Sequence, residues 1–176
     1  MLELRMNEAD VQRVERHLQG FADGAPKVLS RALNKGGRRV RRQILQHLAK
    51  AMGLPQKLVR VWKETAARRA TWRRLTYEIG ISAFRPSLGI FEPKQTKGGI
   101  TRRAGGGRRT IPNAFMIKGK AFTRLSDGRL VPLRGPSPAQ VFYDDDDFRK
   151  TIQERTAQEV GREIRTQTLR LYKTGR

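Results

Sequence analysis

Residues 26–52 read PKVLSRALNKGGRRVRRQILQHLAKAM, and the predicted architecture is built around them. Apolar or small residues recur every three or four positions, the period of one helix face: Leu29, Leu33, Gly36, Val40, Ile44, Leu48 and Ala51. Pro26 suits the first turn of a helix, and Gly53 ends it. The pattern predicts an amphipathic helix of about 40 Å with cations on its other face. Gly36 and Gly37 weaken its middle but permit the close approach of another backbone.

Three further helices are predicted around this one. Residues 8–20 form a short helix capped by Asn7, and another helix opens at Pro55. The last helix runs over residues 145–173 with a narrow apolar stripe. The acids Asp144 to Asp147 stand at its N-terminus, where the helix dipole favours negative charge.

Near residue 72 the apolar period changes from helical to alternating. Leu75, Tyr77, Ile79 and Ile81 alternate with other residues, the pattern of a strand with one buried face. Further strands are predicted at 88–91, 114–117 and 120–125, and a tight turn at 126–128 leads into residues 130–131. Together these segments predict one antiparallel sheet within residues 72–133.

A basic, glycine-rich segment interrupts this sheet. Residues 94–110 hold five Gly, six Lys or Arg and one large apolar residue. Such a segment buries too little to offset the entropy of ordering it, so we expect a flexible basic loop. Pro132, Pro136 and Pro138 then predict an extended linker before the last helix.

The order of these elements predicts an α+β fold in a single domain, residues 1–176. It comprises a short N-terminal helix, a long basic amphipathic helix, an antiparallel β-sheet with a long basic loop, and a C-terminal helix. A length of 176 residues with 37% hydrophobic content suffices for one modest core.

Charge is the dominant signal in the composition. Lys and Arg total 38 against 16 Asp and Glu, a formal net charge of +22. Residues 24–63 contain no acid but eleven Lys or Arg, and residues 93–126 again contain no acid. Because self-repulsion of this size must be offset, the surplus implies a partner of opposite sign: a nucleic acid, an anionic surface or an acidic protein.

No constellation typical of catalysis or metal binding is present. The chain has no Cys and two His, His17 and His47, each on or beside an apolar helical face. The Asp144–Asp147 run lacks the further oxygen ligands of a cation site, and Gly105–Arg109 lacks the pattern of a phosphate-binding loop. We therefore expect no enzyme activity, no cofactor and no metal. The N-terminus does not resemble a signal peptide and no apolar run is long enough to span a bilayer, so we expect a soluble protein with no membrane partner.

The basic residues are the one functional signal. We expect the following to contact a partner or DNA: Arg31, Lys35, Arg38, Arg39, Arg41, Arg42, Arg102, Arg103, Arg108 and Arg109. Few aromatic residues are available for base stacking, which favours a purely electrostatic contact over base readout. Charge alone leaves open whether the partner is protein or DNA.

Four stretches give the chain a resemblance to a known family. They are Arg31–Lys35 (RALNK), the basic segment 58–71, the loop running into Ile111, Pro112, Asn113, Ala114 and Phe115, and the proline-rich passage before the last helix. In these, from about residue 25 onward, the chain resembles the minor tail protein Z family of long-tailed phages, the lambda-type tail-completion proteins. That family has Gly where this chain has Asn113, and the Asp144–Asp147 run is not part of its pattern.

The resemblance implies a structural virion protein. Such proteins complete the head-proximal end of the tail, join it to the capsid neck, and are similar to neck proteins that form rings, commonly hexamers. The implied partners are further copies of the chain, tail tube or tail terminator proteins, and neck or connector proteins, with the DNA end or the tape measure protein as further candidates. The implied location is the virion tail, after assembly in the host cytoplasm.

Two expectations accompany this interpretation. In a ring around the DNA conduit, we expect Asp144, Asp145, Asp146 and Asp147 to face cations of a neighbouring subunit or an adjoining tail protein. The competing interpretation is a basic nucleic-acid-binding protein outside any virion, of the ribosome- or nucleoid-associated type.

Overall fold

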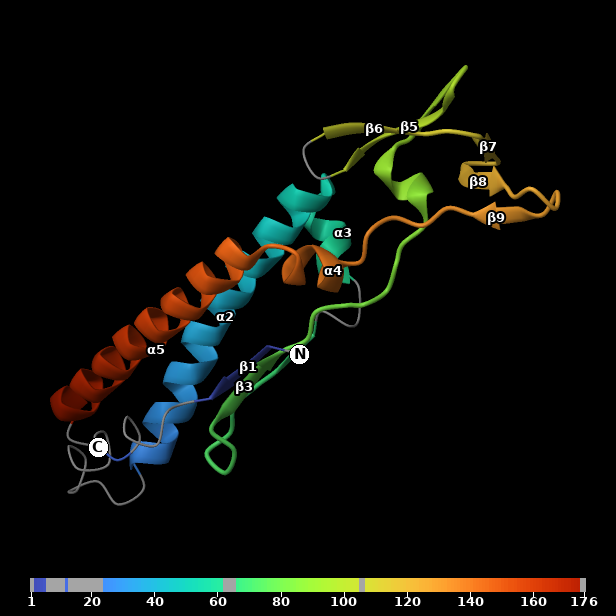
Figure 1. The fold of residues 1–176 in the computed structure, drawn as a ribbon. Helices are drawn as coiled ribbons and strands as arrows, with labels where there is room; N and C mark the ends of the chain where they lie inside the picture. Colours follow the sequence, from blue (N-terminus) through green and yellow to red (C-terminus); the bar gives the residue numbers. More distant parts are fainter. Residues whose placement is uncertain (1, 6–11, 13–23, 62–65, 105–106, 175–176) are drawn as a thin grey trace. The chain divides into compact units, whose positions relative to one another are not determined.

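The computed structural model describes residues 2–5, 12, 24–61, 66–104 and 107–174, and these form an α+β fold (Figure 1). The helices are α2 (Gly24–Met52), α3 (Gln56–Val61), α4 (Pro138–Tyr143), α5 (Asp146–Thr174) and the 3₁₀ helix η2 (Leu88–Phe91). The strands are β1 (Leu2–Arg5), β2 (Ala67–Arg68), β3 (Thr76–Ile79), β4 (Lys94–Thr96), β5 (Gly99–Ala104), β6 (Gly107–Ile111), β7 (Ala114–Ile117), β8 (Lys120–Arg124) and β9 (Leu130–Pro132).

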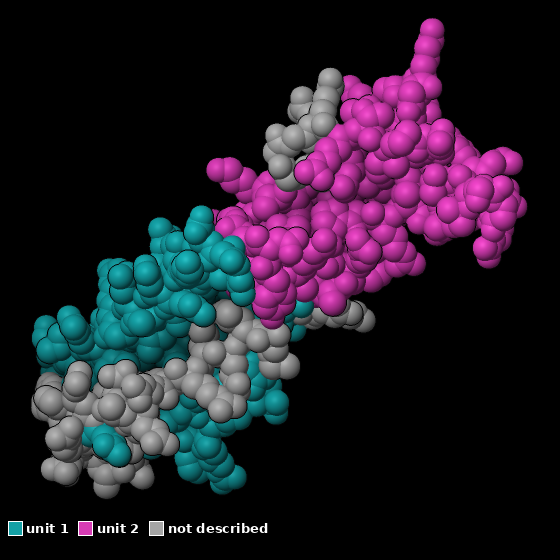
Figure 2. Space-filling model, in the orientation of Figure 1, with its two compact units in different colours: residues 1–44, 65–81, 146–176 teal, residues 45–64, 82–145 magenta. Residues whose placement is uncertain are grey.

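The chain divides into two compact units, coloured separately in Figure 2. Unit 1 comprises residues 1–44, 65–81 and 146–176, and unit 2 comprises residues 45–64 and 82–145. Helix α2 begins in unit 1 and ends in unit 2. The expectation of a single domain stays a prediction.

The predicted long helices are confirmed, and so is the apolar stripe of the first. Within α2 the most deeply buried side chains are those spaced by three, four or seven: Leu29, Leu33, Val40, Ile44 and Leu48. Helix α5 lies alongside α2 in unit 1 (Figure 1) and buries Ile152 and Val160 of its own stripe. The predicted helix at 8–20 lies outside the described residues, apart from position 12.

Gly36 and Gly37 of α2 are the points of closest approach in unit 1. A Cβ atom placed on Gly36 would lie 3.1 Å from Cγ2 of Val160 on α5. A Cβ atom placed on Gly37 would overlap the ring of Tyr77 on β3. The two glycines therefore let a helix and a strand pack against one turn of α2, as their sequence suggests.

The sheet of unit 1 has the strand order β1–β3–β2, with both pairs antiparallel. The alternation predicted around residue 77 is confirmed, because Tyr77 and Ile79 are each 2% exposed while Thr76 and Glu78 are half-buried. Strand β1 is absent from the sequence-based prediction. Its signal is the short alternation Leu2-Glu3-Leu4-Arg5, which gains strand structure by pairing with β3.

Unit 2 contains two further three-stranded antiparallel sheets, β4–β5–β6 and β7–β8–β9. The predicted strands at 114–117, 120–125 and 130–131 and the turn that holds Gly128 are confirmed. The described strands thus form three sheets, and the prediction of one continuous sheet is wrong.

The expectation of a flexible loop at 94–110 is also wrong for the described residues of that segment. Strands β4, β5 and β6 pair there and satisfy one another's backbone groups, so little side-chain burial is needed. Ile100 is fully buried, and Gly99, at φ 130°, lies too close to the Ile111 carbonyl oxygen to admit a Cβ atom. The side-chain amide of Gln95 accepts from the Met116 N–H at 2.9 Å and donates to the Ala114 carbonyl oxygen at 3.3 Å, which joins this sheet to β7.

Two segments adopt helix where the sequence predicted extended chain. Residues 88–91 form η2 instead of a strand, because Leu88 and Phe91, three residues apart, are both buried and Ser87 caps the turn by accepting from the Gly89 N–H. Residues 138–143 form α4 within the predicted linker. Ser137 is its N-cap and accepts from the Gln140 N–H at 3.1 Å, and Pro138 occupies the first turn.

The Gly37 contact yields a stability prediction. We expect Gly37→Ala to lower the free energy of unfolding by about 1–3 kcal/mol, because overlap with the Tyr77 ring outweighs the helix propensity that alanine adds. Gly161→Ala on α5 is the matched control: nothing lies within 4 Å of its Cβ position, so it should stabilise by about 0.5–1 kcal/mol. Urea unfolding of both variants measures this, and equal effects would contradict the packing role of Gly37.

Candidate anion-binding surfaces

The predicted basic residues of α2 separate into two groups. Arg31, Arg38 and Arg42 are exposed, and their spacing of seven and four residues places them on one helix face. No carboxylate of a described residue lies within 4 Å of these three side chains; Arg38 donates from Nε to the Asn34 carbonyl oxygen at 3.1 Å. This outward group is available to a partner.

The second group is engaged inside unit 1. Arg39 pairs with Glu159 and with Glu163 of α5, each at 2.9 Å, and Lys35 lies 3.8 Å from Glu163. The hydrogen bond from Glu159 is the main cause that raises the pKa of Arg39. Glu163 is 4% exposed and also accepts from Gln167 at 3.3 Å. Lys35 and Arg39, both expected to contact a partner, instead bind α5 to α2.

A basic turn between β2 and β3 adds to the outward group. Arg68, Arg69 and Arg73 are exposed there, and Trp72, 59% exposed, carries the Arg73 guanidinium 4.5 Å from its ring centroid. Thr71 and Arg74 close the turn with paired backbone hydrogen bonds of 2.9 and 3.1 Å. The sequence analysis did not list these residues as a site, although the run RRATWRR at 68–74 was the available signal.

This turn and α2 bring positive charge together around Tyr77. Burial raises the pKa of the Tyr77 hydroxyl, while the positive charges of Arg41, Arg38 and Arg69 oppose that shift. Arg41, the half-buried member of the predicted set, therefore belongs to the same cationic region as Arg38. We call Arg31, Arg38, Arg42, Arg68, Arg69 and Arg73 the unit 1 basic surface.

The four predicted arginines of unit 2 lie on a β-hairpin. The register of β5 and β6 places Arg102 opposite Arg109 and Arg103 opposite Arg108. Arg109 is exposed, whereas Arg102 is half-buried, and its Nε and Nη1 atoms are buried without a hydrogen-bond partner. Burial lowers the pKa of Arg102, and the positive charge of Arg109 across the strand pair lowers it further.

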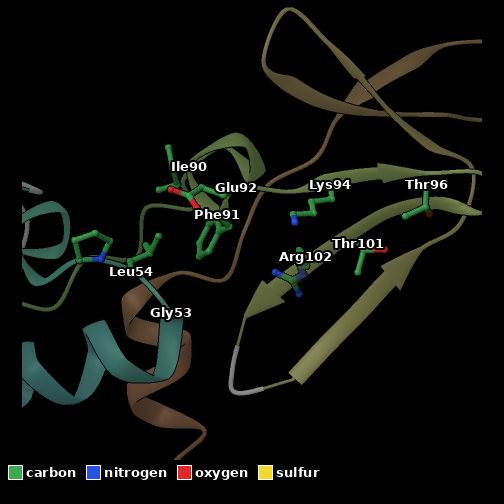
Figure 3. A pocket seen from close by; sticks show the side chains of 10 residues that line it. Gly53, Leu54, Ile90, Phe91, Glu92, Lys94, Thr96, Thr101 and Arg102 are labelled. Atoms are coloured by element: carbon green, nitrogen blue, oxygen red, sulfur yellow. The ribbon is translucent and has the colours of Figure 1, made fainter.

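Arg102 lines a cavity of about 600 Å³ within unit 2 (Figure 3). The end of α2, η2, β4 and β5 supply its walls: Gly53, Leu54, Pro55, Ile90, Phe91, Glu92, Lys94, Thr96, Thr101 and Arg102. In Figure 3 the side-chain nitrogens of Lys94 and Arg102 lie on the side of their strands nearer Phe91. Sequence reasoning could not find this cavity, because its residues come from separate segments of the chain.

The acidic run has contacts within its own chain. Asp144 is the C-cap of α4, and Asp145 lies 3.0 Å from Nε2 of His47 in unit 2. Asp146 pairs with Arg149 in the first turn of α5, where Asp147 also stands. The helix N-terminus interpretation is therefore confirmed for Asp146 and Asp147, and the expected contact of the run with a neighbouring subunit stays a prediction.

The residues shared with the tail-completion motif form the connection between β6 and β7. Ile111 ends β6, Pro112 and Asn113 make the turn, and Ala114 and Phe115 begin β7. Asn113 has a φ of 56°, a left-handed conformation that glycine adopts most easily and asparagine tolerates. The backbone thus accounts for an alternation of Gly and Asn at this position.

Two classes of site are not found among the described residues. No group of three or more His, Cys, Asp or Glu side chains within them is arranged to hold a metal ion. Within the same part of the chain, no helix combines the length and the apolar character needed to cross a bilayer.

The buried carboxylate between α2 and α5 can be tested directly. We expect Glu163→Gln to lower the free energy of unfolding by about 1–3 kcal/mol, because Lys35 loses its acidic neighbour and Arg39 keeps only Glu159. Glu159→Gln, at a more exposed position, should cost less than about 1 kcal/mol. Thermal and urea unfolding measure both; a larger loss for Glu159→Gln would contradict this ranking.

Comparisons with known proteins add no relative. No family model matches the chain, and no curated protein and no solved structure matches it. The resemblance to the tail-completion family therefore stays a prediction.

Proposed function

We propose that this chain is a structural protein of a long-tailed phage that completes the head-proximal end of the tail and contributes to head–tail joining, as a ring around the DNA conduit. The observation that carries the proposal is the unit 1 basic surface. Its arginines point outward, and the three on α2 have no acidic neighbour within 4 Å among the described residues.

The distribution of acids supports an external anionic partner. Glu159 and Glu163 of α5 are bound to Arg39, which sits on the same helix as Arg31, Arg38 and Arg42. These acids therefore do not neutralise the outward arginines, and the net charge of +22 remains on the chain. A DNA backbone passing through a ring of such subunits presents the dense negative charge that offsets this repulsion.

The remaining elements of the proposal come from the resemblance. The RALNK stretch at Arg31–Lys35 and the motif around Asn113 favour a tail-completion protein over other basic proteins. The proposed partners are further copies of the chain, the tail tube or tail terminator, and neck or connector proteins. The proposed location is the tail of the virion.

Contact with DNA predicts a specific dependence on salt. The triple variant Arg31→Gln/Arg38→Gln/Arg42→Gln should bind duplex DNA more weakly, with a log–log salt slope shallower by about 2–3 units, since each lost phosphate contact removes about 0.9. The control Arg85→Gln/Arg124→Gln/Arg134→Gln removes the same charge from exposed positions in unit 2. Fluorescence polarisation measures both slopes, and equal flattening would show that total charge, not this surface, sets binding.

Ring assembly gives a second test of the proposal. Asp144 and Asp147 are exposed, so Asp144→Lys/Asp147→Lys should weaken association between subunits or with tail tube protein by charge repulsion. Asp127→Lys/Glu154→Lys reverses the same charge at other exposed positions and should assemble normally. Native mass measurement of the protein, alone and with tail tube protein, records the oligomer. A monomer under both conditions contradicts the proposed function.

An alternative function is nucleic-acid binding outside a virion, and the turn that holds Trp72 favours it. An exposed indole beside arginines suits stacking on an unpaired base. Under this alternative, Trp72→Ala would weaken single-stranded binding while double-stranded binding persists. Neighbouring genes separate the two functions: tail tube, tape measure and portal genes support the tail protein, and a ribosomal operon supports the alternative.

A further inference from the structure

The cavity of unit 2 contains a cationic group that the chain leaves unsatisfied. The Nε and Nη1 atoms of Arg102 are buried and have no hydrogen-bond partner. A buried guanidinium without an acceptor carries a desolvation cost that an anion or a polar ligand removes. An arginine in this position is therefore suited to a ligand that the chain itself does not supply.

The surroundings of Arg102 increase its demand for negative charge. Arg109 lies opposite it in the strand register, and Lys94 lines the same cavity. Glu92 is the one acid among the lining residues, and it forms no ion pair within 4 Å with Lys94 or Arg102. The cavity thus combines two cations that its own carboxylate does not neutralise.

The other walls define the shape of a suitable ligand. Leu54, Pro55, Ile90 and Phe91 give an apolar side, and Thr96 and Thr101 add hydroxyl groups near the cations. An inorganic phosphate would leave the apolar side without a contact. A carboxylate at the end of a hydrocarbon stem satisfies both sides, since the stem packs on the apolar wall and the carboxylate accepts from arginine.

We propose that this cavity binds a carboxylate carried on a short hydrocarbon stem, such as a glutamyl side chain of a neighbouring protein, with Arg102 as the principal donor and Lys94 as the second cation. The identity of that neighbour as a tail or neck protein rests on the proposed function. Carboxylate binding by the isolated chain does not depend on it, so each can fail separately. A duplex phosphate, flanked by sugars on both sides, suits a recess with apolar walls less well than a projecting side chain.

Titration with small anions tests the site in the full-length protein. The probes are butyrate, which has a carboxylate and a stem, acetate, which has almost no stem, and inorganic phosphate, all at constant ionic strength set with chloride. The arginine Nε–H resonances in ¹H–¹⁵N spectra report binding at Arg102 itself. We expect butyrate to shift the Arg102 resonance saturably and more strongly than acetate or phosphate does.

Two variants locate the effect. Arg102→Gln should weaken butyrate binding about ten- to a hundredfold, as expected for the loss of a charge-assisted hydrogen bond. Arg85→Gln removes the same charge from an exposed position of unit 2 outside the cavity and should bind butyrate as the unmodified protein does. If Arg102→Gln fails to fold, Lys94→Gln and the direct Arg102 resonance retain the test.

The contrary results are equally defined. Tighter binding of phosphate than of butyrate would overturn the carboxylate assignment, and equal loss in Arg102→Gln and Arg85→Gln would show only a general charge effect. Competition of short duplex DNA with butyrate at the Arg102 resonance would assign the cavity to DNA. Saturable butyrate binding by a chain that stays monomeric with tail tube protein would keep the cavity and remove the proposed function.

Discussion

The absence of side chains at Gly36 and Gly37 is the constraint on which unit 1 depends. One turn of α2 is approached by Val160 of α5 through Gly36 and by the ring of Tyr77 through Gly37. Glycine at these positions weakens the helix intrinsically, by about 1 kcal/mol each relative to alanine. The packing that it permits on both sides offsets that weakness, because Val160 and Tyr77 are both buried there.

The same packing sorts the charges of α2. Once α5 lies against Gly36, its acids Glu159 and Glu163 are within reach of Arg39, and Glu163 is near Lys35. Arg31, Arg38 and Arg42, on another face of the helix, stay exposed. A single basic run in the sequence therefore performs two roles: part of it holds two helices together, and part of it remains for a partner.

Unit 2 uses backbone pairing where its side chains are small or charged. Strands β4, β5 and β6 are rich in Gly, Arg, Lys and Thr, and Ile100 is their deeply buried apolar residue. Cross-strand hydrogen bonds and the amide of Gln95 hold this sheet together. One consequence is that Arg102 is fixed at a cavity wall with two buried nitrogen atoms unsatisfied, a state that favours binding of an anion.

The sequence by itself determined the α+β class, the extents of α2 and α5, and the strands β3, β7, β8 and β9, because periodicity over consecutive residues reflects local geometry and one buried face. It also determined the large positive charge. Only the tertiary structure decided which cations are free, since Lys35 and Arg39 differ from Arg31 and Arg42 by the neighbour that α5 places beside them. The sheet at 94–111 and the 3₁₀ helix at 88–91 were likewise decided by pairing and burial between distant segments. The cavity at Arg102 belongs to the same class, because the end of α2, η2, β4 and β5 meet only in the folded chain.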